Sequence, residues 1–268
     1  SLLFEGFVVL FFVDVHCHLE DEAFDKDRNE VIRRAYEAGV IAIINSSLDF
    51  EGAIKSLKLS LQYSGFIFTT LGWDPTDLDR DLVDKLHSLA REQKHKIVGI
   101  GEVGLDYYYV RDHALRELQQ DLFREWIALA RELDLPLVIH SRSAGKYALQ
   151  ILFEEGAERV LMHAYDGRPS WALKAAEAGY YFSIPTSVWR SRQKQKLVRT
   201  LPLEHLMLET DSPVLSPILG RRNEPANIIY AARKIAEIKG VSIERVAEIT
   251  TQNAIDFFSL KLDLPIFK

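Results

Sequence analysis

The sequence has little or nothing of several features that would place it outside the ordinary globular proteins. Its 268 residues include a single cysteine, Cys17, so no disulfide can form within the chain. No apolar run approaches the ~18 residues of a membrane-spanning helix. The segment before Val13 carries Glu5 and shows neither a basic stretch nor a cleavage-site pattern, which argues against a signal peptide. We therefore expect a cytoplasmic protein with no membrane contact.

Clusters of glycine and proline, low-complexity tracts and internal repeats are also absent. With 47% hydrophobic residues, the chain has enough apolar material for one large α/β barrel or two smaller domains. An excess of positive charge is absent too, because the formal net charge is −6. That value argues against a protein that coats nucleic acid through its overall field, whereas one local basic groove is compatible with it.

What the chain does contain is a regular alternation of apolar strands and amphipathic helices. Strands are expected at 7–13, 40–45, 66–71, 97–102, 136–140, 160–163, 180–184 and 206–210. Helices are expected between 25 and 39 and at about 50–62, 78–93, 114–133, 144–153, 171–178, 193–200, 226–237 and 243–257. The alternation predicts an all-parallel sheet. Eight strand–helix units favour closure into a single (β/α)8 TIM barrel over residues 1–268, with an open doubly wound sheet as the alternative.

Three glycines match the dinucleotide-binding fingerprint letter for letter, at Gly99, Gly101 and Gly104. That fingerprint needs a helix directly after the glycines, so that the helix N-terminus faces a pyrophosphate. Here an acidic residue, Glu102, lies inside the motif, and three tyrosines follow shortly after it. We therefore reject a nucleotide-binding loop at this place.

The motif Asp14-Val15-His16-Cys17-His18 closes the first expected strand. Successive side chains of a strand point to opposite faces, which predicts Asp14, His16 and His18 on one face and Val15 and Cys17 on the other. Two imidazoles on one face can bind a metal ion. Asp14 lies one layer deeper, so we expect it to support a ligand rather than to bind metal.

Polar residues end other apolar strands in the same way. One buried histidine is usually an ordinary core residue, but six polar groups at equivalent positions are hard to explain by packing, because each uncompensated group costs roughly 1–3 kcal/mol. The carboxyl ends of barrel strands also gather on one face. The predicted metal ligands are His16, His18, Glu102, His140, His163 and Asp211.

Four imidazoles and two carboxylates exceed one tetrahedral site and predict two divalent ions, with Glu102 as the bridge. The two histidines of the first strand would share one ion with Asp211, and His140 and His163 would hold the other. Asp211 could also accept the proton of the attacking water, so Glu102 and Asp211 are the predicted catalytic residues. Such a site suits hydrolysis of phosphate esters, and amide hydrolysis is an alternative.

Basic and aromatic residues of the loops are candidate substrate contacts. Arg142 and Arg222 are predicted to hold phosphate, whereas for Lys194 and Lys196 a solvated helix face is favoured. Loop aromatic side chains either stack on bases or pack the loops. They are Trp73, Tyr107, Tyr108, Tyr109, Tyr165 and Trp189.

Five motifs together resemble the TatD-related deoxyribonucleases of the metal-dependent amidohydrolase superfamily. They lie at 14–19, 101–108, 135–142, 208–213 and 222–225. The resemblance implies a (β/α) barrel that hydrolyses DNA phosphodiesters with divalent metal, often 3′→5′. The expected substrate is DNA, single-stranded or at 3′ ends, and the ligand types leave Mg²⁺, Mn²⁺ and Zn²⁺ open as the two ions. The resemblance implies the same six metal ligands, and no obligate protein partner is inferred.

The sequence also departs from the family pattern. Asp74, in Gly72–Pro75, replaces a histidine that usually lies near the substrate phosphate, and Asp166 adds another acid. Both carboxylates motivate a second hypothesis, a two-metal hydrolase of a small phosphoester, an amide or a lactone. A nucleic-acid-binding module without catalysis is the third. Residues 1–10 exceed the usual family start and are expected to be an N-terminal extension, either an added segment lying across the barrel bottom or one that is not native to the protein.

Overall fold

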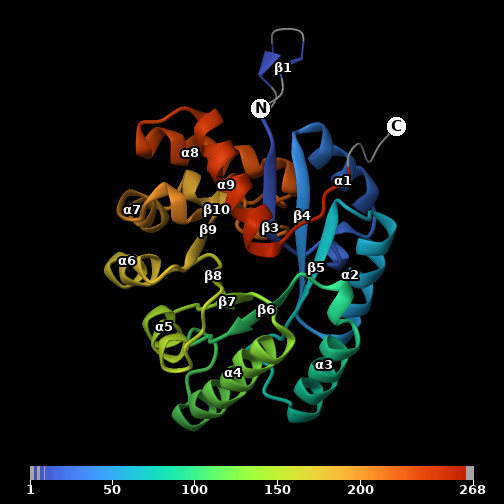
Figure 1. Ribbon diagram of the computed structural model, residues 1–268, viewed down its shortest axis with the longest axis vertical. Coiled ribbons are helices and arrows are strands. Elements are labelled where there is room, and N and C mark those ends of the chain that lie inside the picture. The colour runs from blue at the N-terminus through green and yellow to red at the C-terminus, as the bar shows by residue number, and fades with distance from the viewer. Residues whose placement is uncertain (1–2, 5–6, 9, 264–268) are drawn as a thin grey trace.

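The computed structural model describes residues 3–4, 7–8 and 10–263 of the chain. Eight parallel strands form one sheet in the order β10-β9-β8-β7-β6-β5-β4-β3, with helices around the outside (Figure 1). The strands are β3 (Phe12–Cys17), β4 (Val40–Ser47), β5 (Ile67–Leu71), β6 (Gly99–Gly104), β7 (Leu137–His140), β8 (Val160–Met162), β9 (Tyr181–Pro185) and β10 (Leu206–Glu209). All eight expected strands are therefore present within a few residues of their expected bounds, except that the first begins later.

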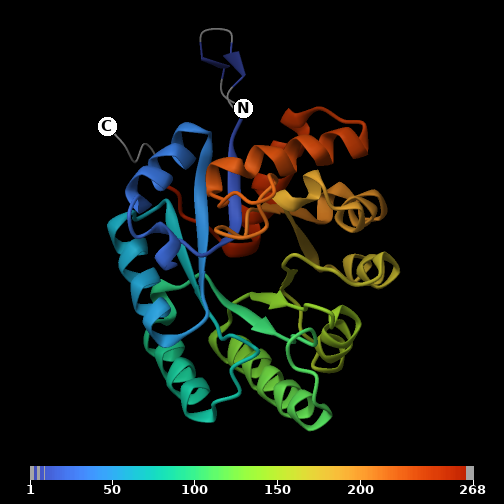
Figure 2. The same cartoon turned by 180° about the vertical axis from the view of Figure 1, so that it is seen from behind.

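The helices alternate with the strands as expected, and the ring that they form is seen from behind in Figure 2. They are α1 (Arg28–Glu37), α2 (Phe50–Gln62), α3 (Arg80–Glu92), α4 (His113–Leu133), α5 (Gly145–Glu154), α6 (Pro169–Glu177), α7 (Arg192–Thr200), α8 (Ile228–Lys239) and α9 (Ile243–Phe258). Several start at a side-chain cap, such as Asp49, which accepts a hydrogen bond from Gly52 N at 2.7 Å, and Asp112, which accepts one from Leu115 N at 3.0 Å.

The first and last strands of the sheet are joined at their carboxyl ends. His18 N donates to Ser212 O at 2.8 Å, and Asp211 N donates to His16 O at 2.9 Å. Below these bonds, the Asp14 carboxylate accepts from Thr210 N at 2.9 Å and from Thr210 Oγ1 at 2.5 Å. We call these contacts the closing seam. They complete the barrel, which confirms the predicted (β/α)8 fold and rules out an open doubly wound sheet.

The barrel has two apolar cores. The larger one lies between the strands and the outer helices. The smaller one fills the barrel interior with Val13, Val15, Val138 and other strand residues, and it includes Phe257 and Phe258 of α9. Helix α9 therefore closes the end of the barrel away from the carboxyl ends of the strands, which leaves only the carboxyl end open for a functional site.

Strand β3 does not follow the strict alternation that the sequence predicts. Val15 packs in the barrel interior whereas Cys17 packs in the outer core, so the two side chains lie on different faces. The pairing of β3 with β4 shifts register between Asp14 and Cys17. An irregularity of this kind re-aims the following side chains, and the expected sharing of faces is wrong for Val15 and Cys17.

The three glycines of the rejected fingerprint belong to β6 itself. A Cβ at Gly101 would come within 2.5 Å of the Val138 Cβ, and one at Gly104, where φ is +148°, within 2.0 Å of His140 O. Both glycines let β6 approach β7 closely. No helix follows them directly, and the rejection of a dinucleotide-binding loop is confirmed.

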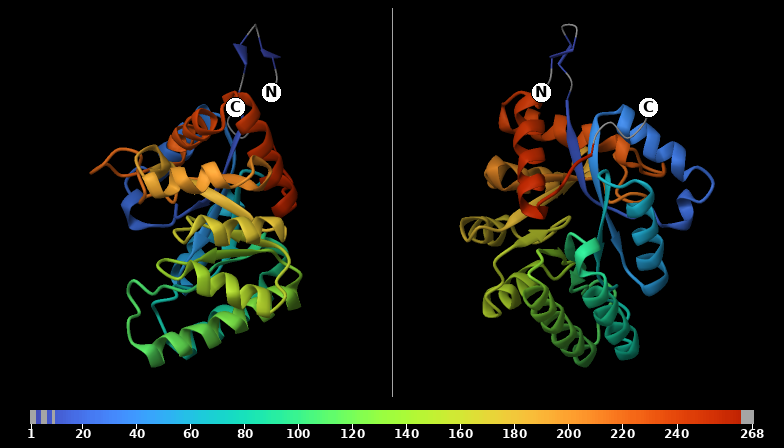
Figure 3. Two further views of the ribbon diagram at one scale, coloured as in Figure 1. Left: turned by 90° about the vertical axis from the view of Figure 1, so that its left-hand side faces the viewer. Right: turned by 45° about the vertical axis from the view of Figure 1, so that its right-hand side comes forward.

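Two short antiparallel strands, β1 (Leu3–Phe4) and β2 (Phe7–Val8), precede the barrel. They stand away from it at the start of β3 rather than across its bottom, as all views show (Figures 1 and 3). The expected position across the barrel bottom is wrong for this part of the N-terminal extension, and residues 1–2, 5–6 and 9 lie outside the described residues. In the described chain, no helix combines the length and apolar character needed to cross a membrane.

Candidate metal centre

All six predicted ligands meet at the open end of the barrel. His16 comes from β3, Glu102 from β6 and His140 from β7, while His18 directly follows β3, His163 follows β8 and Asp211 follows β10. A cavity of about 620 Å³ opens over them. The convergence follows from the parallel sheet, because the carboxyl ends of its strands lie together.

Glu102 lies at the middle of this cluster. Its Oε2 is 2.6 Å from His16 Nε2, 3.5 Å from His163 Nε2 and 3.9 Å from His18 Nε2. Its Oε1 is 3.3 Å from His140 Nδ1. One carboxylate thus faces four imidazoles, with a different oxygen toward each side.

Asp211 faces His16 of β3 and His18 directly after it. Its Oδ1 is 3.4 Å from His18 Nε2 and 3.6 Å from His16 Nε2. The backbone at Asp211 is left-handed, with φ +55°, and it is held by the closing seam. Such backbone strain is found where the surroundings fix a side chain in one position.

Each imidazole is oriented by a hydrogen bond at its outer nitrogen. His16 Nδ1 pairs with Ser46 Oγ at 3.1 Å, and His18 Nδ1 with Ser46 O at 2.7 Å. The other two histidines use carboxylates at 2.9 Å, since His140 Nε2 pairs with Asp106 Oδ2 and His163 Nδ1 with Glu209 Oε2. A metal-binding histidine typically gives its second nitrogen to such an acceptor, so that the first is aimed at the ion.

These orienting residues are not among the residues predicted from the sequence. Asp106 follows β6 and Glu209 lies at the end of β10, so the carboxylate in a short apolar strand was a signal for Glu209. Ser46 gave no signal, because a serine inside a buried strand is common. Their partners come from other strands, and only the closed barrel brings them together.

The charged side chains of the cluster shift one another's pKa values. Burial alone would raise the pKa of Glu102, but the surrounding imidazoles, His16 and His163 first, hold it well below its usual range. Burial alone would likewise lower the pKa of His140, but hydrogen bonds to Asp106 and Glu102 raise it to about 10. The site therefore balances buried carboxylates against buried imidazoles.

These side chains fit divalent metal ions. Although His16 Nε2 and Glu102 Oε2 face each other at 2.6 Å, neither of these buried atoms makes a hydrogen bond to any described residue. Two groups of three residues, His16–His18–Glu102 and Glu102–His140–His163, each have their ligand atoms within 4.8 Å of one another. Imidazole nitrogens and carboxylate oxygens are the donors that zinc and manganese bind well.

Comparison with known proteins decides the family. The profile described as TatD related DNase matches residues 13–259. The chain belongs to this family. Human deoxyribonuclease TATDN3 is 43% identical to it over 265 residues, which cover 92% of this chain and 94% of that protein. The resemblance that the five motifs indicate is confirmed.

Two further TatD relatives extend the comparison. The metal-dependent hydrolase YabD of Bacillus subtilis is 36% identical over 254 residues, covering 92% of this chain and 98% of that protein. The crystal structure of YJJV, a TatD homologue from Escherichia coli, matches with a TM-score of 0.87 at 25% identity, covering 95% of this chain and 100% of that one. The chain is an enzyme of this metal-dependent hydrolase family.

Arg142 lines the cavity over the predicted ligands of this TatD protein, and Tyr108 lies beside Arg142. The Arg142 guanidinium lies 4.0 Å from the centre of the Tyr108 ring. Tyr109 is the next ring, at 5.1 Å from the same guanidinium. Both tyrosines are exposed, whereas Tyr107 is buried. Both distances are within the range of a cation–π contact between the Arg142 guanidinium and an exposed ring.

The other two candidate substrate contacts of the TatD protein are engaged elsewhere. Arg222 donates to both carboxylate oxygens of Asp27, at 2.8 and 2.6 Å. Asp74 Oδ1 accepts from Thr76 N at 2.8 Å and from Thr76 Oγ1 at 2.7 Å. Neither residue is among those that line the cavity over the cluster. The structure thus does not bring them to the metal centre, and their roles in substrate binding stay predictions.

Several loop aromatic side chains of the TatD protein are part of its core. Trp73 and Tyr165 are fully buried, whereas Trp189 is exposed and lies 4.9 Å from the Lys234 ammonium. For the buried rings, packing of the loops is the observed role. Base stacking is open only to the exposed ones.

Lys194 corrects another expectation for this TatD chain. Its ammonium is buried and donates to Ala164 O at 2.5 Å and to Tyr165 O at 2.7 Å. Burial lowers its pKa to about 8. The expected solvated helix face is wrong for Lys194, although Lys196, two residues later on the other side of α7, is exposed. Lys194 fixes the loop directly after His163.

Substitution of Lys194 by methionine is expected to speed amide hydrogen exchange in the loop at 163–169. Methionine keeps the length and removes the donor, so two buried carbonyls lose their partner at a cost of roughly 1–3 kcal/mol each. Relief of the buried charge offsets part of that cost in global stability, which makes local exchange the sharper measurement. Lys196→Met on the same helix is the control. Equal exchange in both variants would mean that Lys194 does not hold the loop.

Proposed function

We propose that this TatD-family chain is a two-metal deoxyribonuclease that hydrolyses DNA phosphodiesters from a 3′ end. The observation that supports this most is the position of Glu102, with Oε2 toward His16 and His163 and Oε1 toward His140. A carboxylate that bridges two ions has to lie between the two groups of histidine ligands. The name of the human relative, deoxyribonuclease TATDN3, supports DNA as the substrate. The cytoplasmic location and the absence of an obligate partner belong to the same proposal.

In this proposal, His16, His18 and Asp211 would hold one ion and His140 and His163 the other, and Glu102 would contribute to both. When bound, the two ions activate water and neutralise charge on the entering and leaving oxygens of a phosphodiester. Asp211 accepts the proton of the attacking water, because its carboxylate lies at the edge of the cluster and lines the cavity. Arg142 holds a non-bridging phosphate oxygen.

The working ion is part of the test. Metal-stripped protein is incubated with 3′-labelled and 5′-labelled single-stranded oligonucleotides, with Mg²⁺, Mn²⁺ or Zn²⁺ added in turn. The proposal expects a ladder of products that requires metal, with a label pattern that shows 3′→5′ digestion. Asp211→Ala is the control for contaminating nucleases. Absence of cleavage with any ion, while bound metal is measured, would contradict the nuclease.

Arg142→Ala is expected to raise KM for oligonucleotides by about tenfold or more, with a smaller change in the amount of metal bound. The reason is that a charge-assisted contact to phosphate is lost while all six proposed ligands remain. Kinetics and metal analysis on the same preparation measure the two effects. Arg199→Ala, an exposed arginine of α7, is the matched control. A KM equal to that of the control would remove Arg142 from the phosphate site.

The second candidate function, hydrolysis of a small phosphoester, an amide or a lactone, is favoured by one observation. The cavity wall on the side of β3 and α2 is acidic and disfavours a long polyanion there. Its acids are Glu20, Asp21, Glu22, Asp49 and Glu51. Rates with small esters far above those with oligonucleotides would support this alternative.

A further inference from the structure

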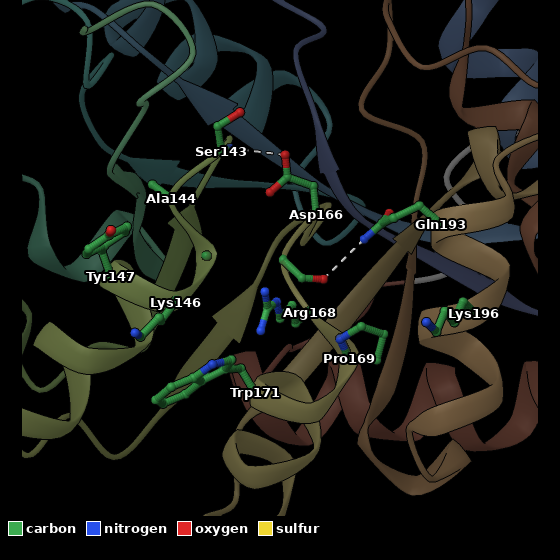
Figure 4. A pocket seen from close by; sticks show the side chains of 12 residues that line it. Ser143, Ala144, Lys146, Tyr147, Asp166, Arg168, Pro169, Trp171, Gln193 and Lys196 are labelled. Atoms are coloured by element: carbon green, nitrogen blue, oxygen red, sulfur yellow. Dashed lines mark hydrogen bonds between the residues drawn. The ribbon is translucent and has the colours of Figure 1, made fainter.

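A second cavity lies beside the metal centre, and its volume is about 660 Å³ (Figure 4). Its walls are the loop after β7 with the start of α5, the loop after β8 with the start of α6, and helix α7. Arg142 lines the metal cavity and the next residue, Ser143, lines this one. Ser143 N donates to Asp166 Oδ2 at 3.1 Å, which ties the two loops together. The two cavities are thus neighbours on the open end of the barrel.

The charge of this cavity is opposite to that of the acidic wall. Lys146, Arg168 and Lys196 line it, with Asp166 as the acid. Among the described residues, none of these three cations has an ion-pair partner. Figure 4 shows the Arg168 guanidinium near the middle of the cavity and Lys146 near Trp171. Three cations without an ion-pair partner among the described residues, gathered in one concave site, attract a polyanion.

Aromatic side chains accompany these cations. Trp171 lines the cavity, and the Lys146 ammonium lies 5.5 Å from the centre of its ring. Tyr147, another lining residue, is half exposed. Aromatic rings beside basic side chains are the arrangement by which proteins bind single-stranded nucleic acid, since a base stacks on the ring and its phosphate meets the cation.

We propose that this cavity binds the nucleotides of a single DNA strand that adjoin the phosphodiester in the metal centre. One base stacks on Trp171, and the phosphates contact Lys146 and Arg168. The strand leaves the metal cavity past Arg142 because the opposite wall is acidic. A small phosphate ester would need the cations but not the ring, so the pairing of the two favours a nucleotide strand. This inference rests on the proposed nuclease function and names the subsite of that function.

The test compares a dinucleotide with a longer single-stranded oligonucleotide. Binding of labelled oligonucleotides is followed by fluorescence anisotropy in metal-stripped and in metal-loaded protein. For the longer strand, Lys146→Ala/Arg168→Ala and Trp171→Ala are each expected to raise Kd about tenfold. The double variant also flattens the salt dependence of log Kd, by about 0.7 for each lost phosphate contact. For the dinucleotide, which does not reach the cavity, the change is smaller.

Lys96→Ala is the control, because Lys96 is an exposed lysine ahead of β6 at the other end of the barrel. Equal Kd values for this control and the two cavity variants would overturn the subsite, whether or not the protein cuts DNA. Equal loss for the dinucleotide and the longer strand would also overturn it. Hydrolysis assays run in parallel report the nuclease separately. If no oligonucleotide is cut and the cavity variants still weaken binding selectively, the subsite stands and the proposed reaction falls.

Discussion

Glu102→Ala is expected to abolish hydrolysis, with a loss of more than about 10³-fold in kcat. Loss of a single electrostatic donor already costs about 10²–10³ in other enzymes. Glu102 faces all four imidazoles, so its removal alters both proposed ion sites at once. The fold is expected to survive, because the substitution removes a carboxylate at the cavity floor and leaves both apolar cores untouched.

This result is checked by initial rates on an oligonucleotide, by metal content after desalting and by circular dichroism. Glu158→Ala, at an exposed position before β8, is the matched control and is expected to behave like the unmodified protein. Glu102→Gln keeps the shape of the side chain and removes its charge, so a similar loss in that variant would assign the effect to charge. A Glu102→Ala protein that retains most of its hydrolysis rate would contradict the proposed bridging role of Glu102.

Asp14→Ala is expected to have the largest effect on stability, a loss of about 2–6 kcal/mol in the free energy of unfolding. Asp14 is fully buried and accepts hydrogen bonds from Thr210 N and Thr210 Oγ1. Alanine leaves both groups buried without that acceptor, and each unsatisfied group costs about 1–3 kcal/mol. Urea unfolding of metal-stripped protein measures the loss without a contribution from bound ions.

Asp14→Asn separates the shape of this contact from its charge. Burial raises the pKa of Asp14 to about 8, and an amide of the same shape can accept from Thr210 N and donate to Thr210 Oγ1. We therefore expect asparagine to retain most of the stability that alanine loses. Asp121→Ala, at an exposed position of α4, is the control and is expected to stay within about 0.5 kcal/mol. If Asp14→Ala and Asp121→Ala have the same free energy of unfolding, the closing seam does not depend on Asp14.

The sequence was sufficient for the barrel and for the convergence of six polar residues, since both follow from local patterns. Strand ends are visible as polar residues after apolar runs, and a parallel barrel places all such ends together. No such local pattern marks the residues that bind the outer nitrogens of the imidazoles. Glu209, for instance, orients His163 across 46 positions of the chain, and no local pattern records which acid will face which ring.

Contacts between residues far apart in the chain also explain the other differences between the predictions and the structure. Arg222 is basic and close to a family motif, yet its partner is Asp27, 195 positions earlier. Lys194 has the spacing of a surface residue, but the loop after β8 covers it. The register shift in β3 arises from pairing with β4 and has no signature in the motif itself. In each case the deciding neighbour is distant in the chain.

The closing seam can form only after most of the described chain has been synthesised. Asp14 and Thr210 are 196 positions apart, and the seam holds His16, His18 and Asp211 in one place. A ribosome adds about 5–20 residues per second, so the first strand waits roughly 10–40 s for its partner. During that interval the newly made histidines have no opposing carboxylate from the last strand. A nascent chain that has not reached residue 211 therefore lacks both Asp211 and the backbone bonds that hold His16 and His18 beside it.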